Sequence, residues 1–103
     1  MPSAGGMASG LAHVIGVFIS NFVLPRRLGW VTGADGSYAL AQNPDTVVVP
    51  DMAFVRWERL PGRQVPDDYI PVPPDLAVEV ISPTDRPADI ARKQDIYLSL
   101  IHI

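Results

Sequence analysis

Proline is unusually frequent in this chain. Eleven of its 103 residues are proline, and each one fixes φ at about −65° and removes a backbone N–H donor, which excludes it from helix interiors and central strands. Five of them fall between residues 60 and 74. We therefore expect many extended connections between the elements of the fold.

The composition favours one folded domain. With 48% hydrophobic and 18% charged residues, the chain is not disordered and is long enough to bury one core. It has no cysteine, which excludes disulfides and thiolate metal sites, so a cytoplasmic location is expected. The net charge of −3 disfavours tight nucleic-acid binding, but a carboxylate active site is itself acidic until its metal binds. Charge alone does not decide between these classes.

The first 25 residues contain no Lys, Arg, Asp or Glu. Within them, a polar stripe at helical spacing lies opposite an apolar one, which predicts an amphipathic helix over about residues 8–24 that packs on a sheet. The polar stripe is Ser9, His13, Gly16 and Ser20, and the apolar one is Leu11, Val14, Ile15, Phe18 and Phe22. The apolar stretch 11–24 is shorter than the roughly 20 residues that span a bilayer, and no basic segment precedes it. We expect no membrane association.

Strands are expected before the proline-rich region. Trp30–Gly33 and Ser37–Ala41 flank an Ala-Asp-Gly turn, which predicts a hairpin because glycine accepts positive φ. Thr46–Val49 and Asp51–Trp57 predict one strand that is bent or bulged at Pro50.

The second half of the chain predicts a long loop, a strand and a helix. Residues 60–74 show no periodicity and predict the loop. Leu76–Ile81 is almost continuously apolar, as expected of a strand covered on both faces, and a helix is expected from about Pro87. The last six residues resemble a translation of the transposase adapter used to prepare sequencing libraries. We therefore expect a partial domain at 1–97 and a non-native tail at 98–103.

Glu79 is the most informative polar residue. It interrupts the apolar run Ala77–Ile81, and an unpaired buried carboxylate costs several kcal/mol, so the fold must supply a cation, a donor or a proton. A divalent metal would satisfy this need. The alternative is an edge strand on which Glu79 points to water.

The case for Asp51 as a site residue depends on Glu79. Pro-Asp is a common turn dipeptide, so Asp51 alone is weak evidence of a site. Two neighbouring strands could bring both carboxylates to one side of a sheet, where a hard cation such as Mg²⁺ would bind them together with water, a main-chain carbonyl and a phosphate.

Lys93 is a candidate third element. It shares a helical stripe with Ile90 and Tyr97, the side expected to face the sheet, from which its ammonium could assist an attacking water or stabilise negative charge on a phosphorane. The alternative is a surface pair between Asp89 and Lys93.

Other polar residues carry weaker signals. His13 lies on the polar stripe, where solvation or capping is expected, and His102 falls in the suspected tail. A basic cluster with one aromatic residue could hold a phosphate backbone and stack a base, although nearby acidic residues favour simple surface solvation. The cluster is Arg56, Trp57, Arg59 and Arg63.

Two blocks carry a family resemblance. They are Pro-Asp-Met-Ala-Phe-Val at 50–55 and Pro-Asp-Leu-Ala-Val-Glu-Val-Ile-Ser-Pro at 74–83, followed by Asp85-Arg86 and Lys93. With them the chain up to residue 97 resembles the Uma-two family of restriction endonucleases, a branch of the PD-(D/E)-x-K nuclease superfamily. The resemblance implies an α/β fold with a restriction-endonuclease-like mixed β-sheet flanked by helices, incomplete at both ends.

The resemblance also implies roles for individual residues. Asp51, Glu79 and Lys93 would be catalytic, and Asp51, Glu79 and the Val80 carbonyl would bind Mg²⁺ or Mn²⁺. Ile81 stands where the superfamily pattern has lysine, so Lys93 would supply that amine from the next helix.

The implied activity is hydrolysis of DNA phosphodiester bonds. The alternatives are a catalytically inactive nuclease-fold module for binding or assembly, and a gene fragment without a function of its own. An incomplete sheet leaves unpaired edges, so a homodimer is also open.

Overall fold

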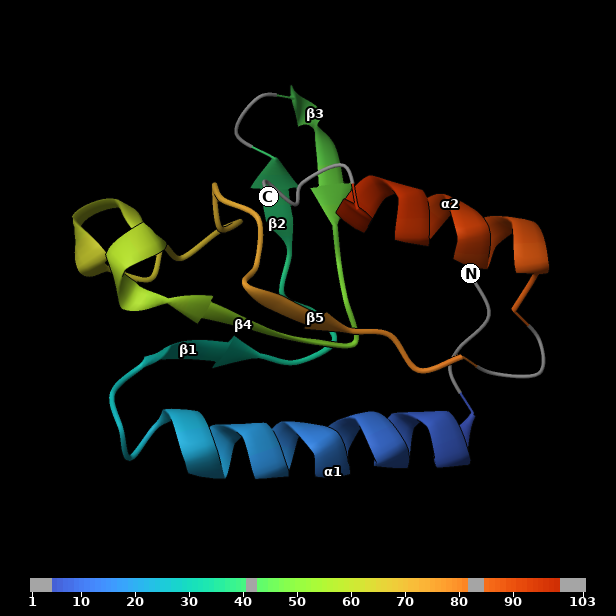
Figure 1. Ribbon diagram of the computed structural model, residues 1–103, viewed down its shortest axis with the longest axis horizontal. Coiled ribbons are helices and arrows are strands. Elements are labelled where there is room, and N and C mark those ends of the chain that lie inside the picture. Colours follow the sequence, from blue (N-terminus) through green and yellow to red (C-terminus); the bar gives the residue numbers. More distant parts are fainter. Residues whose placement is uncertain (1–4, 41–42, 82–84, 99–103) are drawn as a thin grey trace.

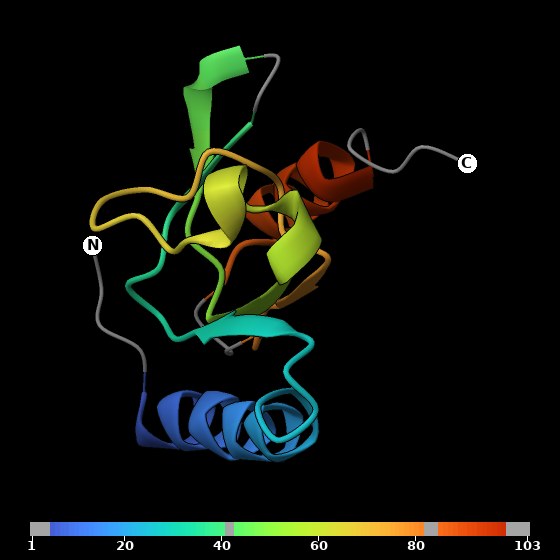
Figure 2. The same ribbon diagram turned by 90° about the vertical axis from the view of Figure 1, so that its left-hand side faces the viewer.

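The computed structural model describes residues 5–40, 43–81 and 85–98. Figure 1 shows α1 along one face of a three-stranded sheet, with the β2–β3 pair and α2 on the other side. Figure 2 shows the same layering at right angles to that view. The elements are α1 (Gly6–Val23), β1 (Gly29–Thr32), β2 (Tyr38–Leu40), β3 (Asn43–Val48), β4 (Met52–Arg56), the 3₁₀ turns η1 (Trp57–Arg59) and η2 (Pro61–Arg63), β5 (Leu76–Val78) and α2 (Pro87–Leu98). Helices flanking an antiparallel sheet confirm the expected α/β class.

Strand β4 is the centre of the larger sheet. Its order is β1-β4-β5, and both pairs are antiparallel. Gly29 of β1 pairs with Arg56, while Met52 pairs with Val78 of β5. As the central strand, β4 is the most buried of the three; Met52, Ala53 and Val55 are buried.

The expected hairpin between the first two strands is wrong. β1 pairs with β4, whereas β2 pairs with β3 in a separate two-stranded sheet. The turn itself is present, because the Gly36 N–H donates to the Gly33 carbonyl at 3.1 Å. Beyond it the chain leaves the first sheet, and the Tyr38 hydroxyl shares a 2.6 Å hydrogen bond with Thr32 Oγ1 that ties the two sheets together.

The proline at position 50 separates two strands rather than bending one. β3 and β4 belong to different sheets, and Pro50 between them is fully buried. Pro50 has no N–H to donate to a ladder, and it lies between the end of β3 at Val48 and the start of β4 at Met52. The expected bend at this position is therefore a change of sheet.

The core lies between the two sheets, on the face of β4 opposite α1. Its buried members are Tyr38, Val48, Ala53, Val55, Leu60 and Ile70. Burial raises the pKa of the Tyr38 hydroxyl. The loop over residues 60–74 is present as expected, and Ile70 anchors its middle because its N–H donates to the Ser37 carbonyl at 2.9 Å.

Helix α1 is present as expected, but it packs through a face that combines Ile15 of the apolar stripe with Gly16 and Ser20 of the polar one. Phe18 is 73% exposed and Phe22 is 55% exposed, whereas Gly16 and Ser20 of the polar stripe are half-buried. A Cβ added to Gly16 would lie 3.6 Å from Met52 Cγ, so the small residues of this face allow the helix to approach the sheet closely. Sequence alone favoured the bulky face because it is the more hydrophobic one.

The same helix is long and apolar enough to cross a membrane by length and composition alone, the one such helix among the described residues. Core helices of soluble proteins and signal sequences pass the same test. Because α1 lies on β1 and β4 (Figure 1), packing on a sheet is the role that the fold gives it.

Strand β5 is shorter and less covered than expected. It spans Leu76–Val78, pairs with β4, and lies at the edge of the sheet in the described part of the chain. Leu76 is 43% exposed and Ile81 is 61% exposed. The expectation of a strand covered on both faces is therefore not met within these residues. Most of the suspected tail, residues 99–103, lies outside them.

Candidate functional site

Asp51 lies directly before β4, and its side chain reaches the segment that follows β5. Its Oδ2 accepts a hydrogen bond from the Val80 N–H at 2.7 Å, and the residue is half-buried. The buried Pro50 fixes the direction from which the chain enters this position. The hydrogen bond therefore joins the start of one strand to the end of its neighbour.

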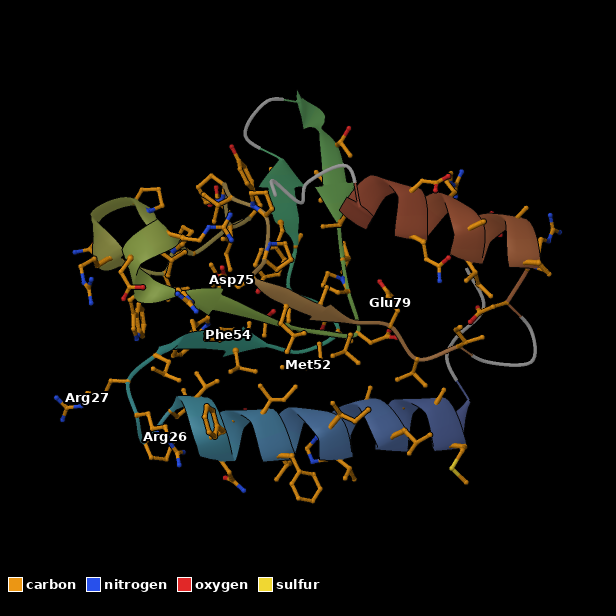
Figure 3. The ribbon with its side chains drawn as sticks, viewed as in Figure 1. Arg26, Arg27, Met52, Phe54, Asp75 and Glu79 are labelled. Atoms are coloured by element: carbon orange, nitrogen blue, oxygen red, sulfur yellow. The ribbon has the colours of Figure 1, made fainter. Side chains whose placement is uncertain are left out.

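Glu79 is the first residue after β5, at the tip of that strand in Figure 3. The last pair of the ladder is Met52 with Val78, so Asp51 and Glu79 are the residues directly beyond it on the two segments. Both residues are half-buried. The two proposed carboxylate residues thus lie at the same end of the β4–β5 ladder.

The chemistry of these donors suits a hard cation. No group of three or more His, Cys, Asp or Glu residues that could hold a metal occurs in the described ranges. A zinc site of the usual histidine and cysteine type therefore does not fit. Mg²⁺ binds through one or two carboxylates and keeps waters or phosphate oxygens as further ligands, so two carboxylates with a main-chain carbonyl fit Mg²⁺ or the similar Mn²⁺.

The predicted amine belongs to Lys93 of α2, whose side chain lies outside the described residues. On the same helix Asp89 forms an ion pair with Arg92 at 3.5 Å, and both side chains are more than half exposed. The role of Lys93 stays a prediction.

A pocket beside Asp51 is lined by His13, for which the sequence suggested only solvation or capping. Its volume is about 220 Å³, and it lies between α1 and the ends of β1 and β4. His13, Ser20, Thr32, Gly33 and Asp51 are among its lining residues. His13 is exposed, as expected, yet it faces the same pocket as Asp51. Its position on the stripe that includes Gly16 and Ser20 was the signal, because that stripe turned out to approach the sheet.

A second aspartate lies at the other end of the ladder. Asp75 Oδ2 accepts the Arg56 N–H at 2.7 Å, and its Oδ1 lies 3.1 Å from Arg59 Nη1. Figure 3 shows Asp75 well separated from Glu79 along the sheet. This carboxylate is neutralised within the fold, which gives it a structural role.

Comparison with known proteins assigns the family. The Uma2 family model, described as "Putative restriction endonuclease", matches residues 1–101. The chain belongs to the Uma2 family. The resemblance noted from the sequence is thereby confirmed over nearly the whole chain, and no curated protein matches it closely enough to add a further assignment.

The two Uma2 blocks of the sequence fall on neighbouring strands. Residues 50–55 contain most of β4, and residues 74–83 contain β5. The restriction endonuclease description associates Uma2 with nuclease activity, with DNA as substrate and with the divalent metals typical of such enzymes. The antiparallel pairing of these blocks is the feature of this chain that bears on such chemistry.

Proposed function

We propose that this Uma2 protein is a metal-dependent endonuclease that hydrolyses DNA phosphodiester bonds in the cytoplasm. One observation supports it above the others, the hydrogen bond from the Val80 N–H to Asp51, which joins the start of β4 to the segment that contains Glu79. The family description supports nuclease activity in general. The cofactor that suits the donors is Mg²⁺ or Mn²⁺.

In the proposed mechanism, Asp51 and Glu79 hold the ion from two neighbouring strands. The Val80 N–H orients the Asp51 carboxylate through the 2.7 Å hydrogen bond, and the Val80 carbonyl is the proposed main-chain ligand. When bound, such an ion lowers the pKa of a water molecule and offsets charge on the phosphate. Lys93, on the following helix, is proposed to assist the attacking water.

Cleavage of supercoiled plasmid DNA by the 103-residue chain tests this proposal. With Mg²⁺ present, we expect Asp51→Ala and Glu79→Ala each to lower the rate by at least about 100-fold, because each removes a metal ligand. Asp67→Ala is the matched control, since Asp67 is exposed and also follows a proline. Undiminished cleavage by either site variant would remove that residue from the mechanism.

A catalytically inactive binding or assembly module is the second candidate. It is favoured by the finding that the described residues offer no third acidic or histidine ligand near the carboxylate pair. Calorimetry with Mg²⁺ or Mn²⁺ separates the two functions. A folded chain that binds neither ion supports the module, and binding that disappears in Glu79→Gln supports the nuclease.

A further inference from the structure

Basic residues gather at the end of the molecule remote from Asp51. Five of the eight Lys and Arg residues lie where α1 joins β1 and where β4 joins the two 3₁₀ turns. Figure 3 shows Arg26 and Arg27 at this end, with Arg27 pointing away from the body of the protein. The five are Arg26, Arg27, Arg56, Arg59 and Arg63.

Three of these arginines are already engaged within the fold. Arg59 lies 3.1 Å from Asp75, and Arg63 lies 3.8 Å from Glu58. Arg26 donates to the Phe22 carbonyl at 3.0 Å and stacks over the Phe22 ring at 4.0 Å.

Two arginines are different. Both Arg27 and Arg56 are exposed, and neither forms an ion pair with a carboxylate of the described residues. Arg26 also keeps its charge, but its guanidinium is held against Phe22, so Arg27 and Arg56 are the two whose side chains form no ion pair, hydrogen bond or ring contact among the described residues.

The fold brings the backbone of Arg56 near the segment that contains Arg27. Arg56 pairs with Gly29, two residues after Arg27, and the Trp57 N–H donates to the Leu28 carbonyl at 3.4 Å. Side chains alternate along a strand, so Arg56 shares the face of Phe54, which packs over Gly29 on the α1 side. Arg27 takes a positive φ of 53° at the turn out of α1. Both guanidinium groups therefore lie near the α1–β1 corner.

The aromatic residue of the basic cluster at 56–63, Trp57, is not part of this surface. Trp57 is half-buried, packs against the core and has its ring centroid 6.1 Å from that of Trp30. Stacking of a nucleic-acid base on Trp57, which the sequence left open, would require this pair to separate. The charge of Arg27 and Arg56 is what remains for recognition.

We infer that Arg27 and Arg56 bind the phosphate backbone of duplex DNA. This inference rests on the proposed nuclease function. Five residues of extended chain separate Asp51 from Arg56, about 17 Å at roughly 3.4 Å per residue, and one DNA strand places about five phosphates over that length. Guanidinium groups match phosphate oxygens in geometry and charge. A chain of net charge −3 would hold a polyanion at such a cationic corner.

Binding of a fluorescent duplex of about 20 base pairs, measured by anisotropy in EDTA over a salt series, separates contact from cleavage. Each lost phosphate contact lowers the slope of log K against log salt by about 0.9. We expect this decrease for Arg27→Gln and again for Arg56→Gln, with the slope retained in the lysine variants. Arg92→Gln is the matched control, because Arg92 is an exposed arginine on α2, and circular dichroism verifies that each variant is folded.

Several outcomes would overturn the inference. These are no duplex binding by the parent chain, unchanged slopes in both glutamine variants, an equal decrease in Arg92→Gln, and tighter binding of RNA than of DNA. The metal site is tested separately. A normal slope in Asp51→Asn with full plasmid cleavage would refute the proposed nuclease site and leave the backbone contact standing.

Discussion

The β4–β5 ladder has an aspartate at each end, and the two aspartates make the same main-chain contact. Asp51 accepts the Val80 N–H and Asp75 accepts the Arg56 N–H, both at 2.7 Å. Extending the register beyond its last pairs would set Asp51 against Glu79 and Asp75 against Val55. In both cases the aspartate accepts the N–H of the next residue along the other segment, Val80 or Arg56. The local geometry of the two ends is therefore nearly equivalent.

The surroundings of the two carboxylates differ in charge. Asp75 has Arg59 at 3.1 Å, so its charge is neutralised by the fold. Asp51 forms no ion pair with a basic residue of the described ranges. A bound cation would therefore give Asp51 the charge compensation that Asp75 already receives from Arg59.

The ends of the sheet also differ in packing. At the Arg56 end, a Cβ on Gly29 would overlap the Val55 carbonyl oxygen and lie 2.7 Å from Phe54 Cε1. At the Asp51 end, a Cβ on Gly33 would meet nothing within 4 Å, and Gly33 lines the pocket beside Asp51. One end is closed by packing and the other is open, as a binding site requires.

The largest effect should come from filling these two glycine positions. Gly29→Ala is expected to lower the free energy of unfolding by about 3 kcal/mol or more, because backbone atoms cannot yield to the new methyl group. Gly33→Ala should leave it unchanged or raise it by up to about 1 kcal/mol through a less flexible unfolded chain. Urea denaturation measures both. Equal losses would show that the Asp51 end is as closely packed as the other.

Binding of Mg²⁺ should distinguish the two ends next. At ten times its dissociation constant, the ion is expected to stabilise the parent chain by about 1.4 kcal/mol. Thermal unfolding with and without Mg²⁺, at matched ionic strength, measures this difference. Glu79→Gln should abolish the stabilisation and Asp75→Asn should preserve it. Stabilisation that is lost in Asp75→Asn and kept in Glu79→Gln would place the metal at the Asp75 end of the ladder and contradict the proposed site.

The sequence predicted the helices and strands better than it predicted which strands pair with each other. Both helices and most strand segments follow from periodicity and proline positions, since these are local signals. The pairing of β1 with β4 depends on contacts between distant segments, and the turn before Tyr38 gave no sign that β2 enters another sheet. The packing face of α1 was misassigned because close approach through Gly16 outweighs the hydrophobicity of Phe18.

The candidate site was only partly visible in the sequence. The chain contains Pro-Asp at residues 44–45, 50–51, 66–67 and 74–75, and no local pattern tells which aspartate belongs to a site. The choice of Asp51 depended on family resemblance and on Glu79, and in the fold both residues lie just beyond the Met52–Val78 pair. The structural role of Asp75 could not be foreseen, because it depends on Arg56 and Arg59 at the end of another strand.

The smallest expected effect compares the two aspartates directly. Asp75→Asn and Asp51→Asn are expected to change stability in opposite directions. Asparagine keeps the side-chain acceptor and removes the charge. Without metal, Asp75→Asn is expected to destabilise the chain by about 1 kcal/mol, since a partly exposed ion pair with Arg59 and a charge-assisted hydrogen bond are weakened. Asp51→Asn is expected to be neutral or stabilising by up to about 1 kcal/mol, because asparagine keeps the acceptor for the Val80 N–H and removes one negative charge from a chain of net charge −3.

Urea denaturation in EDTA, at low and at high salt, measures these two differences. Added salt should reduce both of them, since each depends on charge at a partly solvated site. Equal destabilisation by the two variants would mean that Asp51, like Asp75, is already neutralised within the fold. A metal would then have no electrostatic reason to prefer the Asp51 end.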